Sequence, residues 1–201
     1  MKRRILTVAL SLALVALLVT GASLAYFTDE AEVTNTFIIG NVAIDLAEPA
    51  WVQNSKLVPN TEIPKDPTVT VKANSEDCYV RLLVTISPAD KTDELIPLTE
   101  NTITTVFKGY DATNWRLKKN TKNNDNTRTY EFWYKEKVAS SAADQPLDAL
   151  FDALFVPANL DGEDIKALEN LTITIKAEAI QSAGTNGDMT METAFAALDA
   201  E

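Results

Sequence analysis

The sequence feature that most constrains the fold is a two-residue alternation of apolar and polar side chains, which is typical of half-buried β-strands. It is clearest in CYVRLLVTI, which places Cys78, Val80, Leu82, Val84 and Ile86 on one face and Tyr79, Arg81 and Thr85 on the other. Similar alternation occurs in four further segments: NVAIDL (41–46), TVTVK (68–72), TYEFWYKEKV (129–138) and LTITIKAEAI (171–180). Shorter strand candidates are TITTVF (102–107) and NWRLKK (114–119).

Turn-forming residues separate these segments. Prolines and polar residues break the chain between Pro59 and Pro67, and NTKNNDNT (120–127) predicts a polar hairpin tip between strands that contain Trp115 and Trp133. Many short strands in a 201-residue chain indicate a single all-β domain, over residues 37–201, built as a two-sheet jelly-roll-like sandwich with a few short helical insertions.

Three segments have helical patterns. The spacing of Leu147, Leu150, Phe151, Leu154 and Phe155 behind Pro146 predicts one apolar helical face. GEDIKALEN (162–170) predicts a short helical turn, and METAFAALDAE (191–201) predicts a helix whose apolar face contains Met191, Phe195 and Leu198.

The N-terminus has the organisation of a secretory signal peptide over residues 1–25. Basic residues at positions 2–4 precede an apolar run from Ile5 to Val19, and Ser23 and Ala25 supply the small residues of a cleavage site. We therefore expect cleavage between Ala25 and Tyr26. The alternative is an uncleaved membrane anchor, because the apolar segment approaches the length that spans a bilayer.

Charge and composition exclude several functions. The net charge of −11 becomes −14 when the three basic residues of the signal peptide are removed, which argues against nucleic acid as a partner. The absence of histidine excludes a histidine-based zinc site, a Ser-His-Asp triad and a Cys-His dyad. The single cysteine, Cys78, allows no intramolecular disulfide, and its place in an alternating strand indicates a buried apolar side chain. We expect no cofactor and no enzymatic activity.

Candidate binding residues have simpler structural interpretations. Asp161, Glu163 and Asp164, or Asp125 with its neighbouring asparagines, offer oxygen ligands for calcium, but neither group fits a twelve-residue calcium loop, and solvated loop charges are the favoured interpretation. Trp51, Trp115 and Trp133 are candidates for a sugar-stacking surface, although packing is the favoured role.

Several strings in combination resemble the TasA/camelysin family of secreted biofilm-matrix fibre proteins. They are AYFTD at 25–29, the pattern N-x-F-x-x-G-x-V-x-I-x-L at 35–46, P-x-x-E-I-x-K-D-P in the region 59–67, YVR at 79–81 and EAIQ at 178–181. The resemblance covers the N-terminal half well and residues 107–170 poorly. It implies a protein processed by a SipW-type signal peptidase and exported to the matrix or surface of a Gram-positive-type bacterium.

The resemblance also implies assembly into filaments by insertion of the freed N-terminal segment into the next subunit as a β-strand, with other matrix components as candidate partners. Here the expected donor is residues 26–36, with Phe27, Ala31, Val33 and Phe37 as candidate anchors. The alternative for this segment is an ordinary first strand in the sheet of its own subunit. The alternative is a monomeric surface module that binds carbohydrate or a host protein. A camelysin-type metallopeptidase is a third hypothesis, which the absence of His-Glu-x-x-His disfavours.

Overall fold

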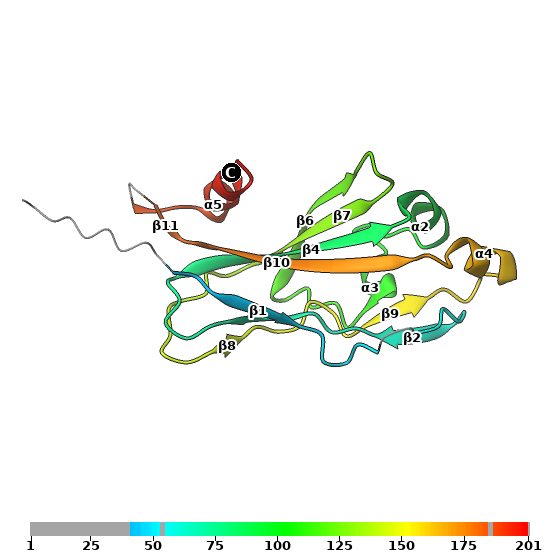
Figure 1. The fold of residues 1–201 in the computed structure, drawn as a ribbon, viewed down its shortest axis with the longest axis horizontal. Helices are drawn as coiled ribbons and strands as arrows, with labels where there is room; N and C mark the ends of the chain where they lie inside the picture. Colours follow the sequence, from blue (N-terminus) through cyan, green and yellow to red (C-terminus); the bar gives the residue numbers. More distant parts are fainter. Residues whose placement is uncertain (1–40, 53–54, 185–186, 201) are drawn as a thin grey trace, which may run out of the picture. The chain divides into compact units, whose positions relative to one another are not determined.

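The computed structural model describes residues 41–52, 55–184 and 187–200, which belong to one compact unit (Figure 1). Its strands pair antiparallel, and its few helices are short, so the chain is of the all-β class. The strands are β1 (Ile44–Ala47), β2 (Thr61–Pro64), β3 (Thr68–Val71), β4 (Cys78–Ser87), β5 (Phe107–Lys108), β6 (Trp115–Lys122), β7 (Arg128–Tyr134), β8 (Gln145–Pro146), β9 (Ala153–Val156), β10 (Thr172–Gln181), β11 (Ala183–Gly184) and β12 (Gly187–Asp188). The helices are α2 (Ala89–Leu95), α3 (Ile103–Val106), α4 (Gly162–Ala167) and α5 (Met191–Leu198).

One layer is a four-stranded sheet with the order β10-β4-β7-β6. The second layer contains two three-stranded sheets, β1-β3-β8 and β2-β9-β5, and β11 and β12 form a separate hairpin (Figure 1). The core lies between the layers. The alternate residues of β4 from Cys78 to Ile86 all face it and are buried, as the alternation predicts.

The other alternating segments also form strands, with two local differences. Alternation predicts Leu46 on the buried face of its strand, but it is 36 % exposed, whereas Ile44 on the same face packs against the core. Trp133 is on the outer face of β7, yet it is buried because Met191 and Phe195 of α5 cover it.

The prediction of a helix over 147–155 is wrong. The backbone N–H groups of Leu147, Leu150 and Asp152 donate to Val69, Pro67 and Lys108 of neighbouring segments, instead of to carbonyl groups one turn earlier. The segment is therefore extended, and it ends in β9. Leu147, Leu150 and Phe151 are buried, so the apolar spacing reflects tertiary burial.

The strand prediction over 102–107 is also largely wrong. Residues 103–106 form the single-turn helix α3, and Val106 N donates to Thr102 O. Only Phe107 continues into a strand, β5. By contrast, 115–122 forms β6, and the two helices predicted near 162 and 191 are present as α4 and α5. The Met191, Phe195 and Leu198 face of α5 packs on the sheet as expected.

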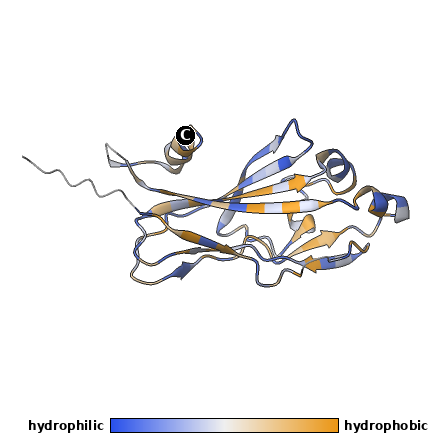
Figure 2. Cartoon of the chain, viewed as in Figure 1, coloured by the Kyte–Doolittle hydropathy of each residue, from blue (hydrophilic) through white to orange (hydrophobic). Residues whose placement is uncertain are grey.

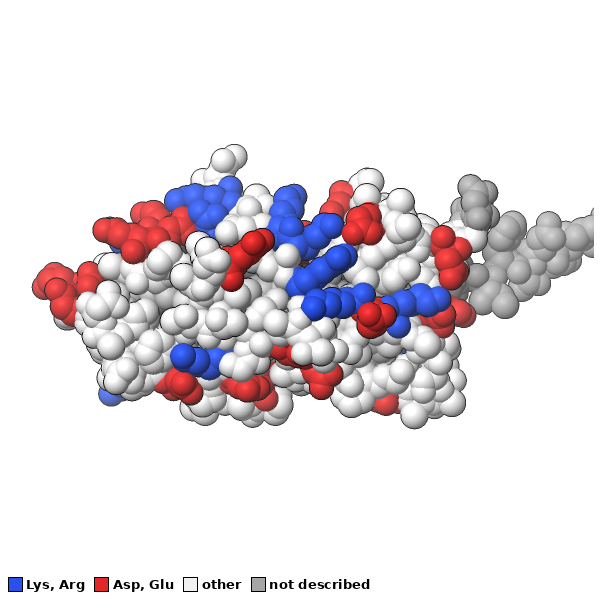
Figure 3. Space-filling view, turned by 180° about the vertical axis from the view of Figure 1, so that it is seen from behind, with Lys and Arg blue, Asp and Glu red and all other residues white. Residues whose placement is uncertain are grey.

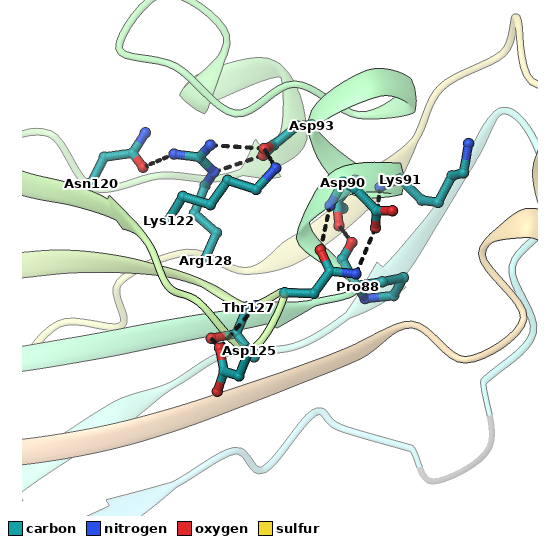
Figure 4. A network of polar contacts seen from close by, with 11 residues as sticks. Pro88, Asp90, Lys91, Asp93, Asn120, Lys122, Asp125, Thr127 and Arg128 are labelled. Carbon is teal, nitrogen blue, oxygen red and sulfur yellow. Dashed lines mark hydrogen bonds and ion pairs between the residues drawn. The ribbon is translucent and has the colours of Figure 1, made fainter.

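The tip of the β6–β7 hairpin is held against α2 by polar contacts (Figure 4). Asn126, in a left-handed conformation, exchanges two hydrogen bonds with Asp90, at 2.8 and 3.0 Å. Arg128 donates two hydrogen bonds of 2.7 Å to the carboxylate of Asp93. Bidentate hydrogen bonds between an arginine and a carboxylate are stronger than hydrogen bonds between neutral groups. The Arg128–Asp93 pair therefore helps to fix this end of the hairpin against α2.

Helix α5 is fixed to the outer face of the four-stranded sheet by Arg81. This buried guanidinium contacts the carboxylates of Glu131, Glu178 and Asp199, and lies 4.8 Å from the Phe195 ring centroid. Asp199 immediately follows the helix, so the ion pairs join the C-terminal segment to three strands.

Candidate functional site

The outer edge of β10 is the most distinctive surface of the described residues. This ten-residue strand is the terminal strand of its sheet, and within the described part of the chain it pairs with β4 alone. The backbone groups along its other edge form no ladder with a described strand, although β1 of the second layer lies close to part of β10. An unpaired edge of this kind can accept a further strand. Apolar and polar residues alternate along it, and Ile173 and Ile175 are partly buried while Thr172 and Thr174 are exposed (Figure 2).

The opposite edge of the same sheet has the features that prevent strand addition. Strand β6 exposes Arg116, Lys118, Lys119 and Lys122, and its pairing with β7 is interrupted by a bulge between Leu117 and Lys119. Basic side chains gather across the middle of the face opposite to that in Figure 1 (Figure 3). Because edge lysines and bulges hinder pairing with another chain, β6 is protected and β10, with Lys176 as its one lysine, is much less so.

A groove of about 540 Å³ opens beside the first residues of β10. We call it the β10 groove. Its walls are mainly apolar and come from both layers of the sandwich, from α2 and from the segment after β1. Its apolar lining includes Trp51, Ile63, Ile86, Ile96, Phe107, Val156, Leu171 and Ile173, and its charged members are Glu48, Lys65 and Glu169.

Lys65 is a buried charged residue in this groove. Its side chain is 4 % exposed, its Nζ lies 2.6 Å from Glu48 Oε1, and the same atom lies 4.5 Å from the ring centroid of Trp51. Two backbone contacts hold the residues around it: Lys65 N donates to Asp152 O at 3.0 Å, and Ala50 N donates to the carboxylate of Asp66 at 2.7 Å. The segments on both sides of the ion pair are thus joined.

The predicted N-terminal site residues, Ala25, Tyr26, Phe27, Ala31, Val33 and Phe37, lie outside the described residues. The acidic candidates have structural roles. Asp161 and Asp164 form the capping box of α4, in which the Asp161 carboxylate accepts from Glu163 N and Asp164 N. Asp125 accepts hydrogen bonds from Thr127 within the hairpin tip. Among the described residues, no group of three potential ligand side chains is arranged to hold a metal ion.

The three tryptophans do not form a sugar-stacking surface. Trp115 and Trp133 are buried in different places, the first in the main core and the second beneath α5. Trp51 is partly buried in the β10 groove. Cys78 is fully buried in the main core, which confirms the predicted burial. Desolvation, with a smaller contribution from Asp77, raises the pKa of its thiol to about 11.

Sequence reasoning missed the β10 groove and its ion pair. Lys65 lies inside the proline-bounded motif that carries part of the family resemblance, but nothing in the motif reveals that the side chain is buried. Its partner Glu48 is 17 positions earlier, and only the fold brings the two together. The available signal was a lysine two positions after a buried isoleucine, on the same face of an alternating segment.

Comparisons with protein families, curated proteins and solved structures gave no match to this chain. In the described part of the chain, no helix combines the length and apolar character needed to cross a bilayer.

Proposed function

We propose that the chain is a secreted structural subunit of extracellular biofilm-matrix fibres, related to the TasA/camelysin family, with a jelly-roll-like sandwich. Subunits join head to tail when the N-terminal segment of one copy, released by a SipW-type signal peptidase, pairs with the next copy. The observation that carries the proposal is that the outer edge of β10 is unpaired among the described residues and lies beside an apolar groove. Strand addition takes its affinity from backbone hydrogen bonds along such an edge and its specificity from pockets for alternate side chains.

The polarity of the fold supports donation between copies. Asn41, the first described residue, is hydrogen-bonded to Glu76 near the start of β4, whereas Ile86 at the other end of β4 lines the β10 groove. The ten residues of β4 separate these ends by about 30 Å. A segment arriving from a neighbour beyond the groove end would run antiparallel to β10. The same segment folded back from its own Asn41 would run parallel to β10, the slightly less stable pairing.

Such a contact uses different surfaces on the two partners. A donor at one end and an acceptor at the other leave each joined pair with one free donor and one free groove. Heterologous contacts of this kind produce open filaments unless the rotation between copies closes a ring. In this proposal the signal peptide keeps the donor unavailable until export, so cleavage and assembly are coupled.

The test compares purified protein starting at Tyr26 with a variant that also lacks residues 26–36. We expect the first to form filaments in negative-stain images and the second to fold, as judged by circular dichroism, but to stay monomeric. A second variant, Val33→Asp with Phe37→Asp, should assemble weakly, because burying an unpaired charge costs several kcal/mol. The matched control is Thr34→Ser, a conservative change at a residue of the same segment that is not a candidate anchor, and it should assemble normally. Filaments of unchanged length from the truncated protein would refute strand donation.

A monomeric binding module is the second candidate, since the volume of the β10 groove is within the range typical of small-ligand sites. Size-exclusion chromatography of the mature protein, with and without a glycan panel, separates the two proposals. A persistent monomer with a saturable ligand would favour the binding module.

A further inference from the structure

The Lys65–Glu48 ion pair in the β10 groove is incomplete. An ammonium group has three N–H donors, and among the described residues Glu48 is its one carboxylate partner. Glu48 Oε1 is itself buried and makes no hydrogen bond of acceptable geometry with any described residue, although it lies 2.6 Å from Nζ. Lys65 Nζ also lies 4.5 Å from the centroid of the Trp51 ring, and the groove that Lys65 lines is mainly apolar.

The two members of the pair are not equally buried. The Lys65 side chain is 4 % exposed, whereas that of Glu48 is 24 % exposed. Glu48 can therefore turn toward water at little cost, while Lys65 stays in the groove. A buried ammonium without a partner is strongly unfavourable, so any occupant that displaces Glu48 must bring a negative charge.

The N-terminal segment has the required chemistry. Residues 26–40 contain Asp29, Glu30 and Glu32 and no lysine or arginine, and these acids alternate with or adjoin apolar residues. The third charged residue of the groove lining is Glu169, which is exposed just beyond α4. Lys65 is therefore the one cationic residue among the lining residues, and it is the group that a carboxylate entering the groove would meet.

We propose that Lys65 is a specificity-determining residue for assembly: in the joined state it binds a carboxylate of residues 29–32 from a second copy, and Glu48 holds its place in the free subunit. This inference rests on the proposed function, because it names the contact by which the acceptor recognises the donor. Glu48 then acts as a competitor of the incoming carboxylate, and the exchange keeps Lys65 paired throughout.

If Glu48 competes with the donor carboxylate, substitutions of Glu48 and of Lys65 should change filament assembly in opposite directions. In protein starting at Tyr26, Glu48→Gln should lower the concentration at which filaments first sediment, because it removes the competing charge. Lys65→Met, which keeps the length and apolar stem, should raise that concentration at least about tenfold, since truncating one member of a buried charge pair typically costs binding of this size or more. Thermal unfolding of both variants shows whether each is folded.

A structural ion pair without a role in recognition predicts a different result. Both variants would then weaken the fold and shift assembly in the same direction, and that outcome would overturn the inference. If Lys65→Met does not fold, a variant of the donor segment provides the test. Asp29→Asn, Glu30→Gln and Glu32→Gln together leave the β10 groove unaltered. In this background Glu48→Gln should no longer lower the concentration at which filaments first sediment. If Glu48→Gln lowers that concentration equally well in the donor variant, the inference about Lys65 would also be overturned.

Failure of the inference is distinguishable from failure of the proposed function. Loss of filaments on removing residues 26–36, together with unchanged assembly of the Lys65 and Glu48 variants, would leave strand donation in place and refute the carboxylate contact. Filaments that persist without residues 26–36 would refute strand donation itself.

Discussion

Replacing Arg81 by methionine tests how the C-terminal helix is held to the sheet. The buried guanidinium donates to Glu178 and Glu131 at distances of 2.7 and 3.0 Å, and it also contacts Asp199. Methionine preserves most of the side-chain volume and its packing beside Phe195. The substitution therefore removes the charge and its hydrogen bonds with little loss of packing.

The expected cost follows from the exposure of the three carboxylates. Glu131 and Glu178 are 13 % and 15 % exposed, so without Arg81 they remain close together with little access to water. Breaking a buried pair in this way costs about 3–5 kcal/mol. Lys176 stays 2.6 Å from Glu178 and still partly neutralises it, which favours the lower end of this range of about 3–5 kcal/mol. Loss of the contact with Asp199, which is 59 % exposed, adds under about 1 kcal/mol. We expect a loss of about 3 kcal/mol, or roughly 6–12 °C in the melting temperature.

The effect should depend on pH. The hydrogen bond from Arg81 lowers the pKa of Asp199. Desolvation acts to raise the pKa of Glu178, but hydrogen bonds from Lys176 and Arg81 outweigh it and the pKa is lowered. Groups with lowered folded-state pKa values stabilise the fold above their unfolded pKa values, about 3.9 and 4.3, and this contribution is lost as pH falls. The difference between wild type and Arg81→Met should therefore be largest near neutral pH and shrink below about pH 4.

Urea denaturation at low protein concentration measures this difference, with tryptophan fluorescence and circular dichroism as separate probes. Trp133 packs 4.9 Å from Phe195 between ring centroids, so its emission reports the release of α5. Asp199→Asn is the matched control and should cost under about 1 kcal/mol, because its carboxylate is exposed. A loss below 1 kcal/mol for Arg81→Met, or one independent of pH, would refute this account of the cluster.

Three further predictions concern single positions. The Cys78 thiol, whose pKa burial raises to about 11, should not react with an aromatic disulfide reagent at pH 8 until the protein is unfolded in urea; rapid reaction of the native protein would contradict its burial. Asp161→Ala removes the capping box of α4 and should lower the free energy of unfolding by about 1 kcal/mol in urea titrations, whereas an unchanged midpoint would show that the cap adds nothing. Gly109→Ala should cost at least about 1–2 kcal/mol, because Gly109 has a φ of 68° and an added Cβ would lie 2.0 Å from an Asp152 oxygen. Gly162→Ala, where no atom lies within 4 Å of the added Cβ, is its control and should change thermal stability little.

Sequence periodicity identified the strands with long, regular alternation. The pattern in β4 and β10 extends over ten residues, and each buried apolar side chain of β4 faces the core between the layers. The predicted hairpin between Trp115 and Trp133 is also confirmed, since β6 and β7 pair antiparallel with Trp115 opposite Tyr134, but β6 continues to Lys122 and the tip is shorter than the predicted 120–127. In these elements the local preference and the tertiary environment agree.

Prediction from the sequence failed where side chains are buried by segments that are distant in sequence. Leu147, Leu150 and Phe151 have helical spacing, but their segment runs between two other segments that accept its backbone hydrogen bonds. Phe151 stacks on Phe107, with ring centroids 4.2 Å apart, in a contact between residues distant in sequence. The β10 groove was unpredictable for the same reason, because its ion pair and its walls are assembled from segments between positions 48 and 173.

The enclosed position of Cys78 has a practical consequence for trapping subunit junctions. Since the native thiol is covered on all sides, a cysteine introduced at exposed Thr174 would be the one reactive thiol on the described surface. A second cysteine placed in residues 26–36 of a separate, differently tagged copy would then form a disulfide with it if the two segments lie side by side. The register of the junction can thus be mapped one residue at a time, in a background that requires no removal of native cysteine.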